Sequence, residues 1–356
     1  MSNNENKNIW IFAEQQNGKF MNVVFELLGE GNRLAEEITD ECKVCAVLIG
    51  HNVDHQVDEL YSYGADIVYL YDNEAFAHYN GEGYAQILTS AVKQYSPEIV
   101  LFGATSAGNE LAARVSSDLK TGLASNCTKL DIDNANYLDY LKDNADMDIN
   151  NVDINAGNDI LKQTRPGEDE LMTTVITPDT KPQMATVNTG VVDRLEKDDS
   201  KRGEIIKLIG DIKKDSLPVS LIESIKKIKT KISLTDADII CAAGRGLGEA
   251  EGFKLIEEFA DKVGGAVGAS RFAVDSGWIS YDHQVGQSAT YVSPKIYFAC
   301  GISGALQHVV AIQGSDVIVA INKNPDAPIM EIADFAIVGD LYKVIPEIIE
   351  IWDEFK

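Results

Sequence analysis

The chain has 356 residues, of which 45% are hydrophobic, so it can bury full cores and form two domains of ordinary size. Lysine and arginine number 31 against 56 aspartates and glutamates, and the formal charge of −25 repels nucleic-acid backbones and anionic membranes. No apolar run approaches the ~20 residues that span a bilayer, and the first residues do not read as a secretory signal, so we expect a cytoplasmic protein without nucleic-acid partners or membrane insertion.

Residues 8–124 alternate short apolar runs with longer amphipathic stretches. This alternation predicts a parallel sheet with helices packed against it, joined by right-handed connections. We expect strands at 9–13, 44–49, 67–70 and 99–103, and helices at 21–38, 55–63, 83–95 and 108–119.

The cysteines form an odd and scattered set that we expect to be reduced: Cys42, Cys45, Cys127, Cys241 and Cys300. Cys42 and Cys45 have C-x-x-C spacing, which leaves a redox or metal role open. However, residues 44–49 read as a buried strand, and no second pair completes a four-thiolate metal site. Ordinary packing is therefore the favoured interpretation.

Residues 131–159 are crowded with aspartate and asparagine, and Lys142 is their one basic residue. Such a segment buries too little apolar surface to offset its chain entropy, which predicts an exposed insertion or a mobile loop. Asp143, Asp146 and Asp148 lie close in sequence but do not match the spacing of a calcium-binding loop. Solvated acid is favoured over a metal site.

After this segment the chain reads as extended at 160–187 and as a lysine-rich linker with one helix at 190–231. A second α/β pattern follows, with strands expected at 239–243, 266–268, 296–300, 317–321 and 335–338 and helices at 252–263, 304–311 and 344–355. We therefore expect an α/β protein of two domains, each a mainly parallel sheet with helices on both faces, the second doubly wound. The expected boundaries are 1–202 with the acidic insertion 131–159, a linker and helix at 203–233, the second domain at 234–341, and a C-terminal helix at 342–356.

The most informative motif is Cys-Gly-Ile-Ser-Gly-Ala-Leu-Gln-His at 300–308. It follows an expected strand and reads as a glycine-rich turn that opens a helix, with Ser303 as the helix cap. Such a turn can hold a phosphate. Asn322 ends the next strand at the same edge of the sheet, where open α/β folds bind their ligands. The pair predicts a cofactor site.

Other polar groups follow neighbouring strands. Gly-Arg-Gly-Leu-Gly at 244–248 resembles a dinucleotide-binding fingerprint, but Glu249 occupies the position of its last glycine. Arg271 alone reads as one half of a surface salt bridge, and His308 alone as a satisfied helix histidine. Together with Arg245 at successive strand ends, these groups favour a large anionic cofactor.

With these motifs the chain resembles the alpha subunit of an electron transfer flavoprotein, and most closely the versions from anaerobic bacteria. The resemblance runs from 9–14 through 101–105, 114–116 and 182–187. It is most specific in the second domain, where motifs at 244–247, 270–271, 285–287, 301–308, 320–323 and 337–341 stand in family order.

The resemblance implies FAD bound to the second domain, with the residue matching Arg271 against the isoalloxazine ring and the one matching His308 at its carbonyl edge. A cation near a ring that gains negative charge stabilises the reduced form by up to ~4 kcal/mol, or on the order of 100 to 200 mV. The implied contacts are Arg245, Ser270, Arg271, Val285, Gly286, Gln287, Ser288, Ser303, Gly304, Ala305, Leu306, Gln307, His308, Asn322, Asp340 and Leu341.

Two segments depart from the family pattern. Gly286-Gln287-Ser288-Ala289-Thr290 stands where the family has Gly-Gln-Thr-Gly-Lys, which keeps a hydroxyl but loses a glycine and a lysine. Residues 165–171 replace the family's Arg-Pro-Ala-Phe-Gly-Gly-Asn with an acidic run. The second departure leaves the choice of partner open.

The resemblance implies an electron carrier that pairs with a beta subunit and exchanges electrons with an acyl-CoA dehydrogenase or a related flavoenzyme. It leaves open NADH-dependent electron bifurcation with ferredoxin, which would be a separate protein because this chain has no cysteine cluster for an iron-sulfur centre. We assign no catalytic residue and no metal. The alternative is an α/β enzyme or regulator that binds NAD(P) or another nucleotide without flavin, and the incomplete fingerprint disfavours it.

Overall fold

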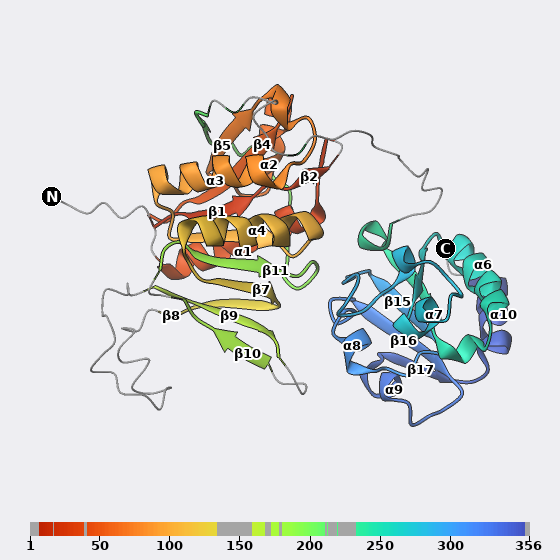
Figure 1. Cartoon of the computed structure of the whole chain (residues 1–356). Coiled ribbons are helices and arrows are strands. Elements are labelled where there is room, and N and C mark those ends of the chain that lie inside the picture. The colour runs from red at the N-terminus through yellow and green to blue at the C-terminus, as the bar shows by residue number, and fades with distance from the viewer. Residues whose placement is uncertain are drawn as a thin grey trace, which may run out of the picture. The chain divides into compact units, whose positions relative to one another are not determined.

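The computed structural model describes residues 7–352 except 17, 39–40, 134–158, 168–171, 178–179, 211, 213–218 and 220–232. The chain divides into two compact units, Met1–Ser224 and Ile225–Lys356 (Figure 1). The division falls inside the segment 203–233, which the sequence predicts as a linker. The helix expected there lies outside the described residues, as does most of the acidic insertion.

The first unit is built on a seven-stranded sheet in which every described pairing is parallel. Short, continuous apolar runs form its central strands because both of their faces are buried. In sheet order the strands are β12 (Glu204–Lys207), β5 (Ile67–Asp72), β4 (Val44–Gly50), β1 (Ile9–Phe12), β6 (Ile99–Gly103), β11 (Gln183–Val187) and β7 (Leu123–Cys127).

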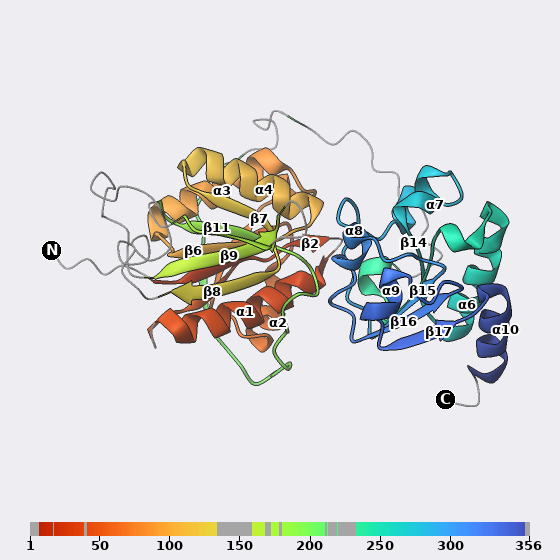
Figure 2. The ribbon, with the colours of Figure 1, turned by 90° about the horizontal axis from the view of Figure 1, so that it is seen from below.

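Helices cover both faces of this sheet, as Figure 2 shows. Apolar side chains of α1 (Asn22–Ile38) and α2 (Val57–Ser62) pack with Ile9 and Ile11 on one face. Those of α3 (Gly81–Tyr95) and α4 (Ser106–Leu119) pack with Trp10 and Phe12 on the other. Successive side chains of β1 therefore point to opposite faces of the sheet and pack in two separate cores.

Three smaller features complete the first unit. A hairpin of β2 (Gln15–Gln16) and β3 (Lys19–Phe20) follows β1. An antiparallel sheet joins β8 (Lys129–Asp133), β9 (Ile160–Pro166) and β10 (Met172–Val175). Gln183 of β11 accepts from the Leu161 N–H at 2.9 Å and donates to the Asp159 carbonyl at 2.8 Å, which ties β9 to β11.

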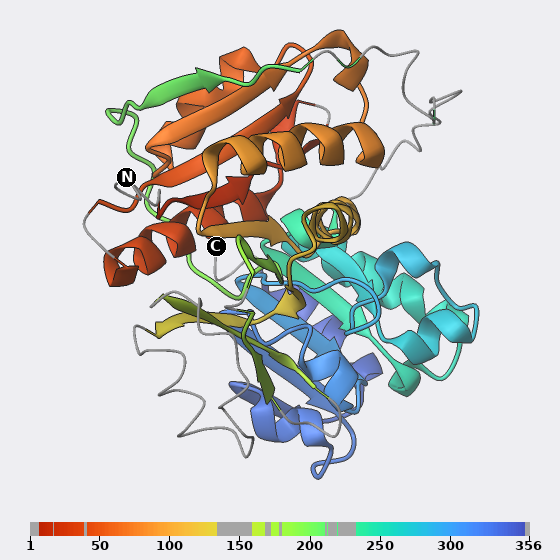
Figure 3. The ribbon, with the colours of Figure 1, turned by 60° about the vertical axis from the view of Figure 1, so that its left-hand side comes forward.

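Edge strand β12 is a feature that the sequence did not predict, because its residues were assigned to the linker. It pairs in parallel with β5, and in Figure 3 it is the light green arrow beside the orange strand. Its side chains are mostly exposed. A short edge strand with few buried residues gives no strong apolar signal.

The two cysteines with C-x-x-C spacing serve packing. Cys42 lies in the core beneath α1, and Cys45 faces the opposite core beneath α3. Burial raises the pKa of the Cys42 thiol to about 11 and raises that of Cys45 as well. All five cysteines are free and buried, which fits the packing interpretation.

The second unit contains a five-stranded parallel sheet with β13 between β14 and β15. In sheet order the strands are β14 (Ala266–Ala269), β13 (Ile239–Ala243), β15 (Ile296–Cys300), β16 (Val317–Asn322) and β17 (Phe335–Val338). The chain moves from β13 to β14 on one side and then returns to β15 on the other. The carboxyl ends of β13 and β15 therefore form the topological switch point, where such sheets bind ligands.

Helices again lie on both faces, and the predicted two-domain α/β fold is confirmed. Helices α6 (Phe253–Val263) and α10 (Leu341–Ile351) lie side by side (Figure 2). Phe259 and Ile345 on these helices are buried in one core. The opposite core contains Ile329 of α9 (Pro328–Ile332) and Ile302, which precedes α8 (Leu306–Val309). The short helix α7 (Arg271–Asp275) follows β14 directly. C-terminal helix α10 thus docks within its own unit.

Candidate functional site

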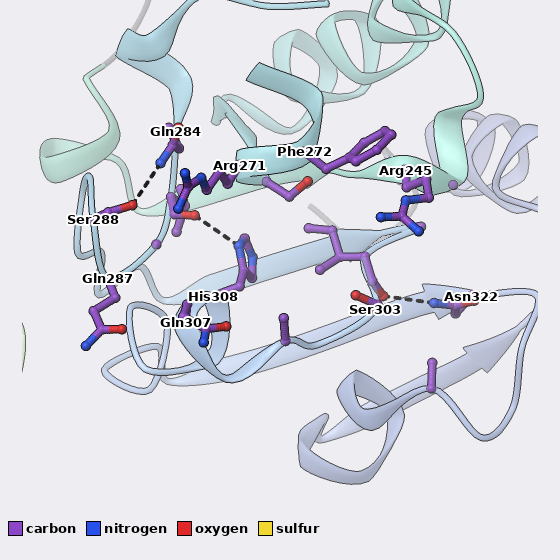
Figure 4. Close-up of a pocket in the computed structure, with 18 of the residues that line it drawn as sticks. Arg245, Arg271, Phe272, Gln284, Gln287, Ser288, Ser303, Gln307, His308 and Asn322 are labelled. Atoms are coloured by element: carbon purple, nitrogen blue, oxygen red, sulfur yellow. Dashed lines mark hydrogen bonds between the residues drawn. The ribbon is translucent and has the colours of Figure 1, made fainter. Parts of the chain in front are cut away.

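A pocket of about 840 Å³ lies at the carboxyl ends of the second unit's strands, a volume typical of cofactor sites. The turn after β13 contributes Arg245, and the loop after β16 contributes Asn322. The rest of the lining comes from Ser270 after β14, the loop 284–288 and the turn after β15 (Figure 4). The polar groups that the sequence places at successive strand ends therefore line one pocket.

Glycines let the turns after β13 and β15 touch at the switch point. The Gly246 N–H donates to the Gly301 carbonyl at 2.9 Å. A Cβ on Gly246 would lie 2.5 Å from the Gly301 Cα, and Gly301 itself has a φ of +63°. Only glycine permits this approach. The close contact holds the floor of the pocket in a fixed shape.

Ser303 does not cap a helix, which corrects the sequence expectation. Helix α8 begins only at Leu306, its N-cap residue is Ala305, and no side chain caps it. The Ser303 carbonyl accepts from the Ile329 N–H at 3.1 Å, and Gly304 takes a φ of +85°. This left-handed turn directs the chain toward α9 before a helix can start, so the expected helix 304–311 is much shorter.

The same turn leaves backbone donors free. Among the described residues, the N–H groups of Ser303, Gly304 and Ala305 have no hydrogen-bond partner. Consecutive free N–H groups in a glycine turn form a concave site for an anion. The turn therefore keeps the phosphate-binding capacity that the sequence suggests, although it works without a capped helix.

His308 is buried, and both of its ring nitrogens are engaged by the protein. Nδ1 lies 3.0 Å from the Val285 carbonyl and Nε2 lies 2.9 Å from the Tyr297 hydroxyl. A carbonyl only accepts, so Nδ1–H donates to Val285 and the Tyr297 hydroxyl donates to Nε2. Burial lowers the pKa of His308 to about 4. His308 is thus a neutral imidazole of fixed tautomer at the pocket wall.

Arg271 begins α7 and is largely exposed, with its Nε 3.2 Å from the Asp275 carboxylate one turn later. An exposed pair of this kind contributes little to stability. Arg271 therefore forms the surface salt bridge that its sequence position suggests and also lines the pocket. In Figure 4 its side chain lies near His308 and Gln284.

Most of the predicted contact residues line this one pocket: Arg245, Ser270, Arg271, Val285, Gly286, Gln287, Ser288, Ser303, Ala305, Gln307, His308 and Asn322. Gly304 and Leu306 belong to the turn and to α8 without lining the cavity. Asp340 caps α10 by accepting from the Tyr342 N–H at 3.0 Å, and Leu341 is buried in the core beneath α10. For all of the predicted residues, contact with a ligand stays a prediction.

Sequence reasoning missed several lining residues, above all Phe272. Its ring lies 4.3 Å from the Arg245 guanidinium carbon. The signal that could have identified Phe272 is its position directly after the Ser270-Arg271 motif. Gln284 was also missed, and its amide lies 3.4 Å from the Ser288 hydroxyl.

An orphaned polar atom tests whether a polar cofactor suits the pocket. The Ser270 hydroxyl oxygen is buried and has no hydrogen-bond partner. A buried hydroxyl without a partner is costly, so it calls for a ligand. Free backbone donors, cationic side chains and this hydroxyl together fit a flavin dinucleotide with its diphosphate and polar ring.

Two other kinds of feature are absent from the part of the chain that the structure describes. Within it, no helix is both long and apolar enough to cross a membrane. Nor do histidine, cysteine, aspartate and glutamate side chains gather there in a group that can hold a metal ion.

Comparison with known proteins places both units in one family. A family model described as the electron transfer flavoprotein domain matches residues 9–211, and one described as the electron transfer flavoprotein FAD-binding domain matches 233–313. The electron transfer flavoprotein subunit alpha of Thermoanaerobacterium thermosaccharolyticum is 48% identical, over 98% of each chain.

Two further relatives carry other names. The acryloyl-CoA reductase electron transfer subunit beta of Anaerotignum propionicum is 39% identical over 99% of this chain and 97% of its own. Protein FixB of Clostridium saccharobutylicum is 40% identical over 96% of this chain and 95% of its own. The similarity thus extends over nearly the full length of each relative.

Proposed function

Because the chain belongs to the family of electron transfer flavoprotein alpha subunits, we propose that it is the FAD-binding subunit of a heterodimer with an electron transfer flavoprotein beta subunit. In this assembly it carries electrons between a donor and an acyl-CoA dehydrogenase-type flavoenzyme. The relative from Anaerotignum propionicum is named for acryloyl-CoA reductase, which supports a partner that acts on acyl-CoA compounds.

The observation that carries this proposal is the pocket at the switch point of the second sheet. It combines free N–H groups at the Ser303 turn with a buried, unpartnered hydroxyl on Ser270. The standard fingerprint of an NAD(P)-binding enzyme ends in a third glycine, and Glu249 occupies that position here. The pocket therefore favours FAD over the alternative of a flavin-free nucleotide site.

The residues of the pocket divide by chemistry along its length. Arg245, Ser303 and Asn322 lie together at one end, which we assign to the diphosphate and the adenosine side (Figure 4). The other end holds amides, a hydroxyl, a cation and an imidazole, which we assign to the flavin ring: Arg271, Gln287, Ser288, Gln307 and His308. Bound FAD would supply reversible electron transfer, and the protein supplies placement and electrostatics.

The charged and neutral groups at the ring end have different roles. Arg271 presents a permanent positive charge, which favours a ring that gains negative charge. His308 is neutral, and its Nδ1–H is committed to the Val285 carbonyl. We therefore assign electrostatic stabilisation to Arg271 and the shape of the pocket wall to His308.

The decisive experiment is purification of the chain together with its beta subunit, followed by a count of FAD per heterodimer and an assay for NADH-dependent ferredoxin reduction. One FAD without ferredoxin reduction indicates simple electron transfer. A second FAD with ferredoxin reduction indicates bifurcation. A colourless protein that binds NADH alone contradicts the proposal.

A further inference from the structure

Among the described residues, Arg245 lies against an aromatic ring and not beside a carboxylate, although the chain is strongly acidic. Its guanidinium carbon lies 4.3 Å from the centre of the Phe272 ring. Within the described part of the chain, Arg245 has no ion pair with a carboxylate, although the chain has 56 acidic residues. Arg271, the other arginine of the pocket, pairs with Asp275. The two arginines are thus held by different forces.

A guanidinium that stacks on an aromatic ring uses its flat face and leaves the N–H groups at its edge free. A carboxylate partner would occupy those same donors. Arg245 therefore presents unoccupied donors to the pocket, as Figure 4 shows with its side chain beside Phe272. Planar donors of this kind suit the oxygens of a phosphate.

The platform beneath Arg245 is itself held in place. The Phe272 ring packs edge-on against Trp278, with centroids 5.6 Å apart and planes at 83°. The backbone of Arg245 is fixed by the contact between Gly246 and Gly301. Phe272 itself remains partly exposed, at 39%. Arg245 covers one face of this ring.

We infer that Phe272 is a positioning residue, which holds Arg245 ready to bind the diphosphate of a nucleotide ligand. The inference deepens the proposed function and rests on it for the identity of the ligand as FAD. Phe272 contributes to affinity through Arg245, so its effect depends on the presence of that arginine and on a diphosphate in the ligand.

A double-mutant cycle on the full chain tests this coupling. Wild type, Phe272→Leu, Arg245→Ala and the double variant are titrated with FAD, with ADP and with riboflavin, which lacks the diphosphate. We expect Phe272→Leu to weaken binding of FAD and ADP about threefold to tenfold and to leave riboflavin unchanged. In the Arg245→Ala background, the same substitution should have no further effect.

Two additional variants serve as controls. Phe272→Tyr keeps the aromatic face and should restore FAD binding. Phe335→Leu removes an exposed aromatic ring on β17, outside the pocket. It should leave the affinities for FAD, ADP and riboflavin unchanged.

Each remaining outcome has a defined meaning. In one outcome, Phe272→Leu weakens FAD binding equally in the wild-type chain and in the Arg245→Ala variant, or weakens the binding of FAD and riboflavin equally. Either result would overturn the inference and leave the proposed function standing. Coupling seen with ADP in a chain that binds no FAD would uphold the inference and contradict the proposed function. A wild-type chain that binds neither ligand would overturn both.

Discussion

Arg271 is the residue on which the electrostatic part of the proposed function depends. We predict that Arg271→Ala lowers the first reduction potential of bound FAD, because it removes a positive charge beside a ring that gains negative charge. The side chain is 72% exposed and pairs with Asp275, so solvent screens it and we expect about 50 mV. A spectroelectrochemical titration measures the change.

The partner carboxylate supplies the matched control for this prediction. Asp275→Asn removes the negative charge that opposes Arg271 and should move the potential upward. An unchanged potential in both variants would show that Arg271 does not act on the ring.

We predict that His308 makes the stability of the second unit depend on pH. Burial lowers its pKa from an ordinary 6.5 to about 4, so between these values the unfolded chain binds a proton that the folded chain does not. Stability is therefore present above pH 6.5 and lost as the pH falls toward 4, by ~3 kcal/mol in all.

His308→Gln should remove this pH dependence. A glutamine can still donate to Val285 and accept from Tyr297, which bond His308 in the native chain. Denaturant unfolding at pH 7.5 and pH 5 measures the free energy of unfolding of the variant and of wild type. Hydrogen exchange of the β15 amides at the same two pH values then compares the stability of the second unit in the two proteins. Equal losses of stability on acidification in both proteins would count against the prediction.

At the scale of single residues, the sequence located His308 and Arg271 through their motifs. It did not reveal Phe272 or Tyr297, because their roles arise from contacts across the fold. Tyr297 lies in a buried apolar strand and reads as core until its hydroxyl is seen 2.9 Å from His308. Side-chain partners of this kind leave no periodic pattern in a sequence.

At the scale of elements, buried parallel strands were predictable because both faces require apolar residues, so β1, β6, β13 and β15 appear as short uninterrupted runs. The failures are equally physical. Helix α8 is short because two left-handed glycines turn the chain first. Such a conformation depends on the packing of Gly304 against Ile329, which the local sequence does not encode.

The turn after β13 offers a test at this scale. Gly246→Ala would place a Cβ 2.5 Å from the Gly301 Cα, where backbone must move. We expect the two turns to separate, with ~1–3 kcal/mol of lost stability and a loss of FAD affinity of tenfold or more. Equilibrium unfolding and flavin titration measure the two effects.

Gly248→Ala provides the control for this test. Gly248 lies in the same turn with a φ of +80°, and a Cβ there would meet nothing within 4 Å. It should cost backbone strain of ~1–3 kcal/mol but little affinity. If both variants lose FAD equally, the contact between Gly246 and Gly301 is not what shapes the pocket.

At the scale of the whole molecule, the length allowed two domains and two successive α/β patterns predicted them, and the chain forms two compact units. Every residue that lines the described pocket belongs to the second unit. A ligand that binds only there stabilises that unit by mass action, by ~2.7 kcal/mol at a hundredfold excess over its Kd. The first unit gains nothing from this linkage if it unfolds separately.

We therefore predict that saturating FAD protects the two sheets unequally. Hydrogen exchange of the isolated full chain should slow about 100-fold in the central strands β13, β15 and β16 of the second unit. Exchange in β1, β4 and β6 should stay unchanged, because the core around Trp10 has no residue in common with the pocket. Equal slowing in both sheets would show that the two units unfold as one cooperative body, and then FAD would stabilise the entire subunit.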